Sequence, residues 1–175
     1  MKELEKIPEK IDKILSGSPK IEELAEKYKN YNNFLFLGRR YNYPVALEGA
    51  LKLKEISYIH SEGYGAGEMK HGPIAMINKD FPTIAIALKK SVSEKMFSNI
   101  EEMKARSGPV IAISTEGDER IKPITDNVFA IPETIEPLEP LLAIVPLQLF
   151  AYFVGVKRGN NVDKPRNLAK SVTVE

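Results

Sequence analysis

The sequence predicts an α/β protein built as a three-layer α/β/α sandwich, in which helices cover both faces of a mainly parallel sheet of about five strands. Short, uninterrupted apolar runs such as 34–38 and 83–88 are typical of strands buried on both faces. Longer segments with helical spacing lie between these runs, and this alternation is typical of right-handed βαβ units. With 175 residues, 43% of them hydrophobic, the chain can bury one sizeable core.

The first half of the chain begins with a predicted helical lead-in, residues 1–30, that packs on the main body. Its clearest helical spacing is that of Ile21, Leu24, Ala25 and Tyr28. The run 34–38 ends in glycine and predicts the first buried strand, and a helix is expected from Pro44 to about Tyr58. The stretch "EGYGAGEMKHGP", residues 62–73, is too polar for a core strand, and we interpret it as a glycine-rich bend.

The second half continues the alternation. Strands are expected at 83–88, 110–114 and 127–132, and helices at 93–108 and 140–157. Most of the last part of the chain has no helical or strand period. The predicted organisation is therefore a lead-in at 1–30, one domain at 31–158, and a C-terminal tail at 159–175 that folds over the active site. In doubly wound folds, ligands lie at the carboxyl ends of the strands.

Composition excludes several classes of function. The 25 Lys and Arg residues and 24 Asp and Glu residues give a net charge of +1, which argues against a nucleic-acid partner. The absence of cysteine excludes disulfides, thiolate metal sites and a cysteine nucleophile within this chain. The charged N-terminus does not resemble a signal peptide, and "PLLAIVPLQLFAYFVGV" reads as a core helix rather than a membrane span. We therefore expect a cytoplasmic protein that does not contact membranes.

The predicted helix that begins at Pro44 carries the most unusual charge pattern. At about 100° per residue, Glu48, Lys52 and Glu55 form one narrow stripe on a helix that is otherwise mostly apolar. Two interpretations are open. The stripe is either a salt-bridge ladder on a solvated edge, or it faces a cleft in which Glu55 acts as a general base and Lys52 holds Glu55 or a substrate oxygen.

Both histidines and the tail also leave alternatives open. His71 is either a turn residue with one backbone hydrogen bond or a proton-transfer group near neutral pH. His60, just past the predicted helix end, is interpreted as a C-terminal cap without a catalytic role. Lys170 lies in a tail that could fray, yet Arg166, Asn167 and Lys170 suit an anionic or polyhydroxylated ligand if the tail folds over it.

Two long segments, "ALEGALKLKEISYIHSEGYGAGEMKHGP" and "VPLQLFAYFVGVKRGNNVDKPRNLAKSVTVE", make the chain resemble the C-terminal end of the glucosamine-6-phosphate synthases, also called glutamine–fructose-6-phosphate aminotransferases. The resemblance runs from about "FLFLGRR" to Glu175. It implies the second of two sugar isomerase (SIS) domains, with a flavodoxin-like sheet, followed by the family's tail. The family makes glucosamine 6-phosphate from fructose 6-phosphate and glutamine-derived ammonia in hexosamine biosynthesis, with no metal or organic cofactor.

The resemblance also implies roles for individual residues. Glu55 in "LKLKE" corresponds to the base that moves a proton between sugar C1 and C2, with Lys52 as a proton carrier and Glu48 as a supporting acid. His71 in "KHGP" corresponds to a residue that helps to open the sugar ring in a neighbouring subunit's site, so the bend should present it outward. Lys170 in "NLAKSVTVE" corresponds to the Schiff-base lysine, and the backbone of Ala169 lines the same site.

One expected element of a complete enzyme is missing from the sequence. SIS domains grip phosphate with a Ser/Thr-rich turn after a strand, whereas the corresponding turns here read "RRYNYP" at 39–44 and "KKSVSEK" at 89–95. We expect the phosphate grip to lie in a first SIS domain outside this chain, together with a glutaminase domain. The chain is then a homodimeric sugar-phosphate isomerase part, weak or inactive by itself. The alternative is a non-catalytic sugar-phosphate-binding or dimerisation module.

Overall fold

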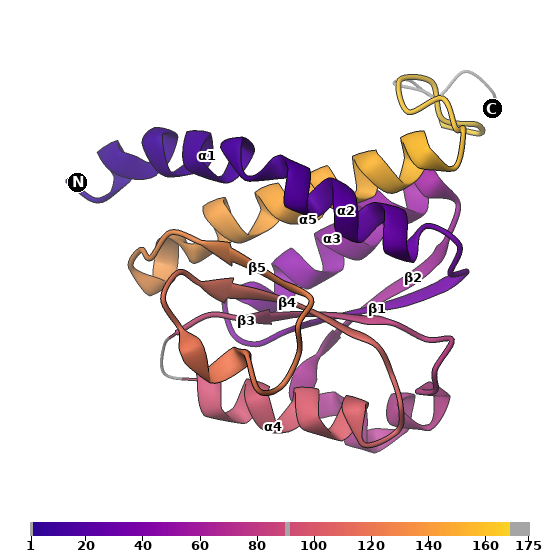
Figure 1. Cartoon of the computed structure of the whole chain (residues 1–175), viewed down its shortest axis with the longest axis horizontal. Helices are drawn as coiled ribbons and strands as arrows, with labels where there is room; N and C mark the ends of the chain where they lie inside the picture. Colours follow the sequence, from indigo (N-terminus) through magenta and orange to yellow (C-terminus); the bar gives the residue numbers. More distant parts are fainter. Residues whose placement is uncertain (1, 90–91, 169–175) are drawn as a thin grey trace, which may run out of the picture.

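The computed structural model describes residues 2–89 and 92–168. Figure 1 shows a sheet between two layers of helices. The strands are β1 (Asn33–Gly38), β2 (His60–Gly65), β3 (Thr83–Ala87), β4 (Val110–Thr115) and β5 (Val128–Ile131). The α-helices are α1 (Ile7–Ser16), α2 (Ser18–Tyr28), α3 (Asn42–Ser57), α4 (Ser93–Lys104) and α5 (Glu139–Lys157). Short 3₁₀ helices are η1 (Leu4–Lys6), η2 (Ala66–His71), η3 (Pro73–Met76), η4 (Glu119–Ile121) and η5 (Glu136–Leu138).

The five strands form one parallel sheet in the order β2-β1-β3-β4-β5. This order is that of flavodoxin-like proteins, and it places the topological switch point between β1 and β3. The prediction of a three-layer sandwich with about five mainly parallel strands is therefore confirmed.

The interpretation of residues 62–73 as a bend was only partly right. Its first residues belong to β2, which pairs with β1 alone and lies at the edge of the sheet. An edge strand is covered on fewer sides than a central one, so it can be polar. The interpretation of His60 as a helix cap is also wrong. Tyr58 is the C-cap of α3, in the left-handed conformation at φ 60°, and His60 opens β2.

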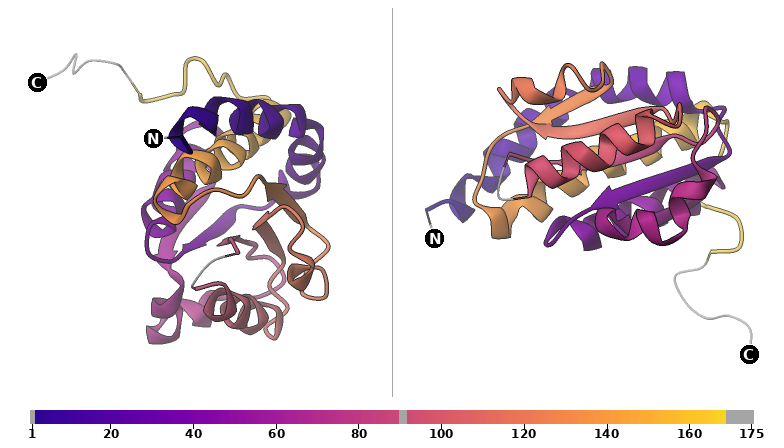
Figure 2. Two further views of the ribbon diagram at one scale, coloured as in Figure 1. Left: turned by 90° about the vertical axis from the view of Figure 1, so that its left-hand side faces the viewer. Right: turned by 90° about the horizontal axis from the view of Figure 1, so that it is seen from below.

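The pleat of the sheet divides the core into two clusters. Phe34 and Phe36 of β1 face the layer formed by α1, α2, α3 and α5, whereas Leu35 and Leu37 face α4 and η2. Strands β3 and β4 alternate in the same way. Figure 2 shows this layering from the end of the molecule, with α4 alone among the α-helices on its side of the sheet. Each strand residue therefore has a helix layer to pack against on one face or the other.

The predicted lead-in forms α1 and α2, which pack against α5 with Ile14, Ile21, Leu24 and Tyr28 buried in the core cluster of that layer. Lys157 at the end of α5 pairs with Glu22 of α2 at 2.9 Å and fixes the two helices at one end. The boundary between the lead-in and the domain stays a prediction, because one continuous core cluster joins them.

Helix α5 runs between α2 and α3. Residues 136–157 form the one segment, within 2–89 and 92–168, that is long and apolar enough to cross a membrane, and half of its apolar window is buried. Leu142, Ala143, Leu147 and Val154 are essentially inaccessible. This packing is that of the core helix that the sequence predicts.

The turn after β4 provides a test of stability against pH. The Asp118 side chain is 2% exposed and accepts three hydrogen bonds from Arg120, two from the guanidinium at 2.8 and 2.6 Å and one from the backbone N–H at 3.2 Å. These bonds lower the pKa of Asp118 below 3.8. Because the folded carboxylate binds protons less readily than the unfolded one, this stabilisation is present above pH 3.8 and is lost as the pH falls through the lower folded pKa.

We predict that Asp118→Asn lowers the free energy of unfolding at pH 7 by about 1–2 kcal/mol, because it removes charge-assisted hydrogen bonds to a half-exposed arginine. The difference between variant and wild type should shrink as the pH approaches 3. Urea unfolding at a series of pH values measures it. A difference that stays constant from pH 7 to pH 3 would mean that the Asp118 charge is not its source.

Candidate functional site

The three charged residues of the predicted stripe lie together on the outer side of α3. Lys52 Nζ donates to Glu55 Oε2 at 2.6 Å and lies 3.6 Å from Glu48 Oε1. The Glu55 side chain is 28% exposed, so its carboxylate is partly shielded but can be reached from outside. The hydrogen bond from Lys52 to Glu55 raises the pKa of Lys52. The lysine is therefore a firmly held cation that keeps its proton at neutral pH.

An open groove of about 450 Å³ borders this ion pair. One wall is the last turns of α3, with Leu51, Lys54, Glu55 and Tyr58, and the other is the segment that follows α5, with Arg166, Asn167 and Leu168. The groove thus joins a carboxylate on α3 to the C-terminal part of the chain, more than a hundred residues away in sequence.

The segment after α5 is tied to the end of α3 at two points. Asn160 Nδ2 donates to the carbonyl oxygen of Ile56 at 3.0 Å. The backbone N–H of Arg166 donates to the Tyr58 hydroxyl at 2.9 Å, and its guanidinium lies 4.1 Å from the centroid of the Tyr58 ring. Ala169 and Lys170 lie outside the described residues.

His71 lies on the other side of the sheet. It closes η2, whose buried residues Ala66 and Met69 belong to the same core cluster as α4, whereas α3 belongs to the opposite cluster. Its side chain is 74% exposed and its Nε2 lies 4.0 Å from Glu68. Within one chain the fold therefore does not bring His71 to Glu55, and it presents this histidine to the outside.

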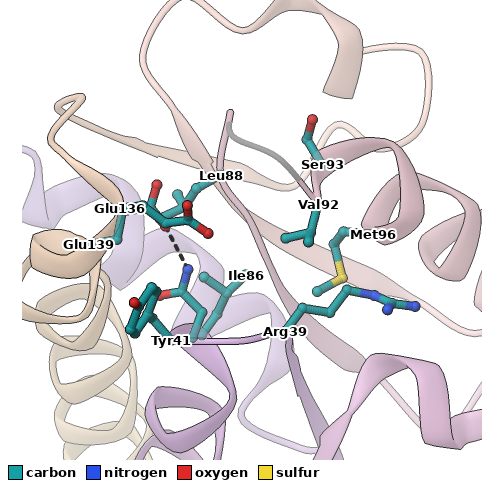
Figure 3. Close-up of a pocket in the computed structure, with 10 residues that line it drawn as sticks. Arg39, Tyr41, Ile86, Leu88, Val92, Ser93, Met96, Glu136 and Glu139 are labelled. Carbon is teal, nitrogen blue, oxygen red and sulfur yellow. Dashed lines mark hydrogen bonds between the residues drawn. The ribbon is translucent and has the colours of Figure 1, made fainter.

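The carboxyl ends of the strands, where ligands bind in many doubly wound folds, hold a different kind of cavity (Figure 3). The crevice at the switch point measures about 10 Å³, which is about the space of one water molecule. Glu136 and Glu139 line it, and Asn42 Nδ2 donates to Glu139 at 2.9 Å. Arg39 also lines the crevice, so its charge is mixed, and its small volume leaves no room for a sugar phosphate.

Glu55 instead lies near the opposite ends of the strands, their amino ends. Helix α3 starts after the carboxyl end of β1 and ends just before the amino end of β2, so its last turn lies where the strands begin. The groove therefore does not lie at the carboxyl ends of the strands, where ligands are expected in doubly wound folds.

Tyr58 and Leu51 are groove residues that the sequence reasoning did not select. Their signal was available, because the spacing Leu51, Glu55, Tyr58 continues one face of the helix. Among the described residues, no three His, Asp or Glu side chains gather as metal ligands do. The expectation that no cofactor takes part stays a prediction.

The fold and this site define a class of protein. The SIS domain family model matches residues 27–156, and the chain belongs to that family. More particularly, the whole chain is similar to enzymes named glutamine–fructose-6-phosphate aminotransferase (isomerizing). It is 56% identical over 172 residues to the Aquifex aeolicus enzyme, and 56% identical over 175 residues to that of Chlorobaculum tepidum.

A solved structure agrees with these relatives. The C-terminal domain of glucosamine-fructose-6-phosphate aminotransferase from Francisella tularensis superposes with a TM-score of 0.86 at 36% identity, over 93% of this chain and 46% of that one. The alignment with the Aquifex aeolicus enzyme includes 98% of this chain but only 29% of that enzyme's length. The resemblance to this family, first inferred from the motifs, is confirmed.

Proposed function

We propose that the chain is the isomerase part of a glutamine–fructose-6-phosphate aminotransferase, active in hexosamine synthesis in the cytoplasm. The observation that carries the proposal is the Lys52–Glu55 ion pair on the wall of the groove between α3 and the C-terminal segment. A carboxylate that is partly shielded, paired and reachable is the arrangement that a general base on a small substrate requires.

Each residue then has a chemical role. The Lys170 amine condenses with the C2 carbonyl of open-chain fructose 6-phosphate and releases water, and ammonia afterwards displaces the lysine from C2. Glu55 removes a proton from C1, and C2 gains one, which yields the C1 aldehyde of glucosamine 6-phosphate. Lys52, held by Glu48 and Glu55, stabilises negative charge that develops on a substrate oxygen. The backbone of Ala169 lines the site beside Lys170.

The phosphate grip, the first SIS domain and the glutaminase belong, in this proposal, to the part of the protein outside this chain. The turns at 39–44 and 89–95 lack the hydroxyl pattern, and the switch-point crevice is too small for a sugar phosphate. Positioning contributes up to about 7–11 kcal/mol to such reactions, so the chain alone should be a weak or inactive isomerase.

The proposal is tested in a chimera in which this chain replaces the matching segment of the Aquifex aeolicus relative. We expect the chimera to form glucosamine 6-phosphate from fructose 6-phosphate and glutamine, and the chain alone to form little. A chimera that folds, hydrolyses glutamine and binds fructose 6-phosphate, but makes no glucosamine 6-phosphate, would favour a sugar-phosphate-binding or dimerisation module instead.

The role of His71 gives a prediction about subunits. If the chains form a homodimer and His71 serves the partner's site, then Glu55→Gln and His71→Asn chimeras are each inactive alone. After mixing and subunit exchange, half of the dimers are mixed, and each has one site with both residues intact, so about a quarter of wild-type activity returns. Glucosamine 6-phosphate formation measures it. No recovery in a mixture shown to contain mixed dimers would exclude the shared site.

A further inference from the structure

The end of α3 is formed by a residue in an unusual backbone conformation. Tyr58 has φ 60° and ψ 23°, and its N–H donates to the carbonyl oxygen of Lys54 at 3.2 Å. Glycine is the usual residue at a left-handed helix end, and a bulky side chain there costs conformational energy. This strained residue lies only three positions after Glu55. The contacts of its side chain explain why a tyrosine rather than a glycine occupies the position.

The side chain of Tyr58 makes two different contacts with a single residue of the C-terminal segment. Its hydroxyl accepts from the backbone N–H of Arg166 at 2.9 Å, and its ring lies under the Arg166 guanidinium at 4.1 Å from centroid to carbon. A hydrogen bond fixes the distance and direction of a backbone, whereas a cation–π contact fixes the side chain above it. Together they hold Arg166 in one orientation against α3.

These contacts close a short loop of chain onto the site. Asn160 is bound to Ile56 of α3, and Arg166 is bound to Tyr58, two residues after Ile56. Between them, Asn161 Oδ1 accepts from the N–H groups of Asp163 and Lys164 and shapes the turn. The segment that ends at Leu168 thereby becomes the second wall of the groove that Glu55 lines.

We propose that Tyr58 is a positioning residue, which holds Arg166 and so fixes the wall of the groove opposite Glu55. As far as catalysis is concerned, this inference rests on the proposed function. Tyr58 contacts no reacting atom in it. Its effect is on the separation between the base on α3 and whatever the C-terminal segment presents, and displacements of about 1 Å in such a separation can cost up to 10²-fold in rate.

Two variants of Tyr58 separate positioning from folding. Tyr58→Phe removes the hydroxyl acceptor but keeps the ring under Arg166. Tyr58→Gly removes both contacts and places at φ 60° the residue that prefers it, so the helix end is not strained by the change. Tyr152→Phe, at an exposed position on α5, is the matched control.

The first measurement is amide hydrogen exchange at Arg166 in the full chain, followed by NMR. We expect exchange about 10-fold faster in Tyr58→Phe than in wild type, and unchanged exchange in Tyr152→Phe, because the N–H loses its acceptor. Equal exchange rates in wild type and Tyr58→Phe overturn the inference, whatever the enzyme does.

The second measurement is the kinetics of the chimera. We expect kcat to fall about 10-fold in Tyr58→Gly, with the KM for fructose 6-phosphate within about two-fold and glutamine hydrolysis unchanged. If Glu55→Gln is inactive while both Tyr58 variants keep the wild-type kcat, this inference fails and the proposed function stands. If Glu55→Gln is fully active, the proposed function fails, and the exchange measurement alone decides whether Tyr58 holds Arg166.

Discussion

Glu55→Gln is expected to lower the rate of glucosamine 6-phosphate formation in the chimera by about 10²–10⁴-fold, the range that a positioned general base contributes. Glutamine keeps an oxygen that can accept from Lys52, so the shape of the site should persist. The amide cannot take up a proton from carbon. Steady-state assays of glucosamine 6-phosphate, with glutamine hydrolysis followed in parallel, give the result.

The free energy of unfolding should change little in Glu55→Gln. The lost ion pair is partly solvated and contributes about 0.5 kcal/mol or less. The matched control is Glu101→Gln, the same chemical change at an exposed position of α4 on the other face of the sheet. A Glu55→Gln variant that keeps more than a tenth of wild-type activity would exclude Glu55 as the base.

Gly38→Ala is expected to have the largest effect on stability. Gly38 ends β1 and leads into α3. A Cβ at this position would lie 2.0 Å from the carbonyl oxygen of Asn42 and 2.8 Å from the backbone nitrogen of Tyr43. Both atoms belong to the first turn of α3, so only a shift of the helix start could make room. We predict a loss of about 3 kcal/mol or more in the free energy of unfolding, a large part of the 5–15 kcal/mol of a typical domain.

The sheet supplies a close control for this prediction. Gly65 ends β2 and is the register partner of Gly38. Its φ is −63°, and a Cβ there would meet nothing nearer than 3.6 Å. Gly65→Ala should therefore be neutral or stabilise the chain by up to about 1 kcal/mol, through the smaller entropy of the unfolded state. Urea unfolding of both variants provides the measurement. Equal effects at the two positions would contradict the packing of α3 on β1.

Much of the fold could be predicted because buried parallel strands are apolar without interruption. The runs that became β1, β3 and β4 have neighbours in the sheet on both sides and helices on both faces. Strand β2, "HSEGYG", escaped this reasoning because it lies at the edge of the sheet and is half-buried. Gly63 within it admits the backbone of α3, since a Cβ there would lie 2.7 Å from Leu47 Cα. In the sequence Gly63 suggested a bend, whereas in the structure it allows α3 to pack closely on β2.

The candidate site also has a part that the sequence predicts and a part that it does not. The stripe of Glu48, Lys52 and Glu55 follows from helical geometry alone, so the sequence was sufficient to place it. The contact between Tyr58 and Arg166 joins residues 108 positions apart, and no local pattern encodes such a contact. The roles of His71, Ala169 and Lys170 come from resemblance to relatives, and they stay proposals.

The most direct measurement follows the bond that Glu55 is proposed to break. Fructose 6-phosphate deuterated at C1 is supplied with glutamine to the wild-type chimera and to its Glu55→Gln variant, and loss of deuterium from C1 is timed. We predict that the wild type breaks this bond, more slowly than the bond to ordinary hydrogen, and that the variant is slower by about 10²–10⁴-fold. Loss of deuterium at the same rate in both proteins would show that another group removes the proton and would exclude Glu55 as the base.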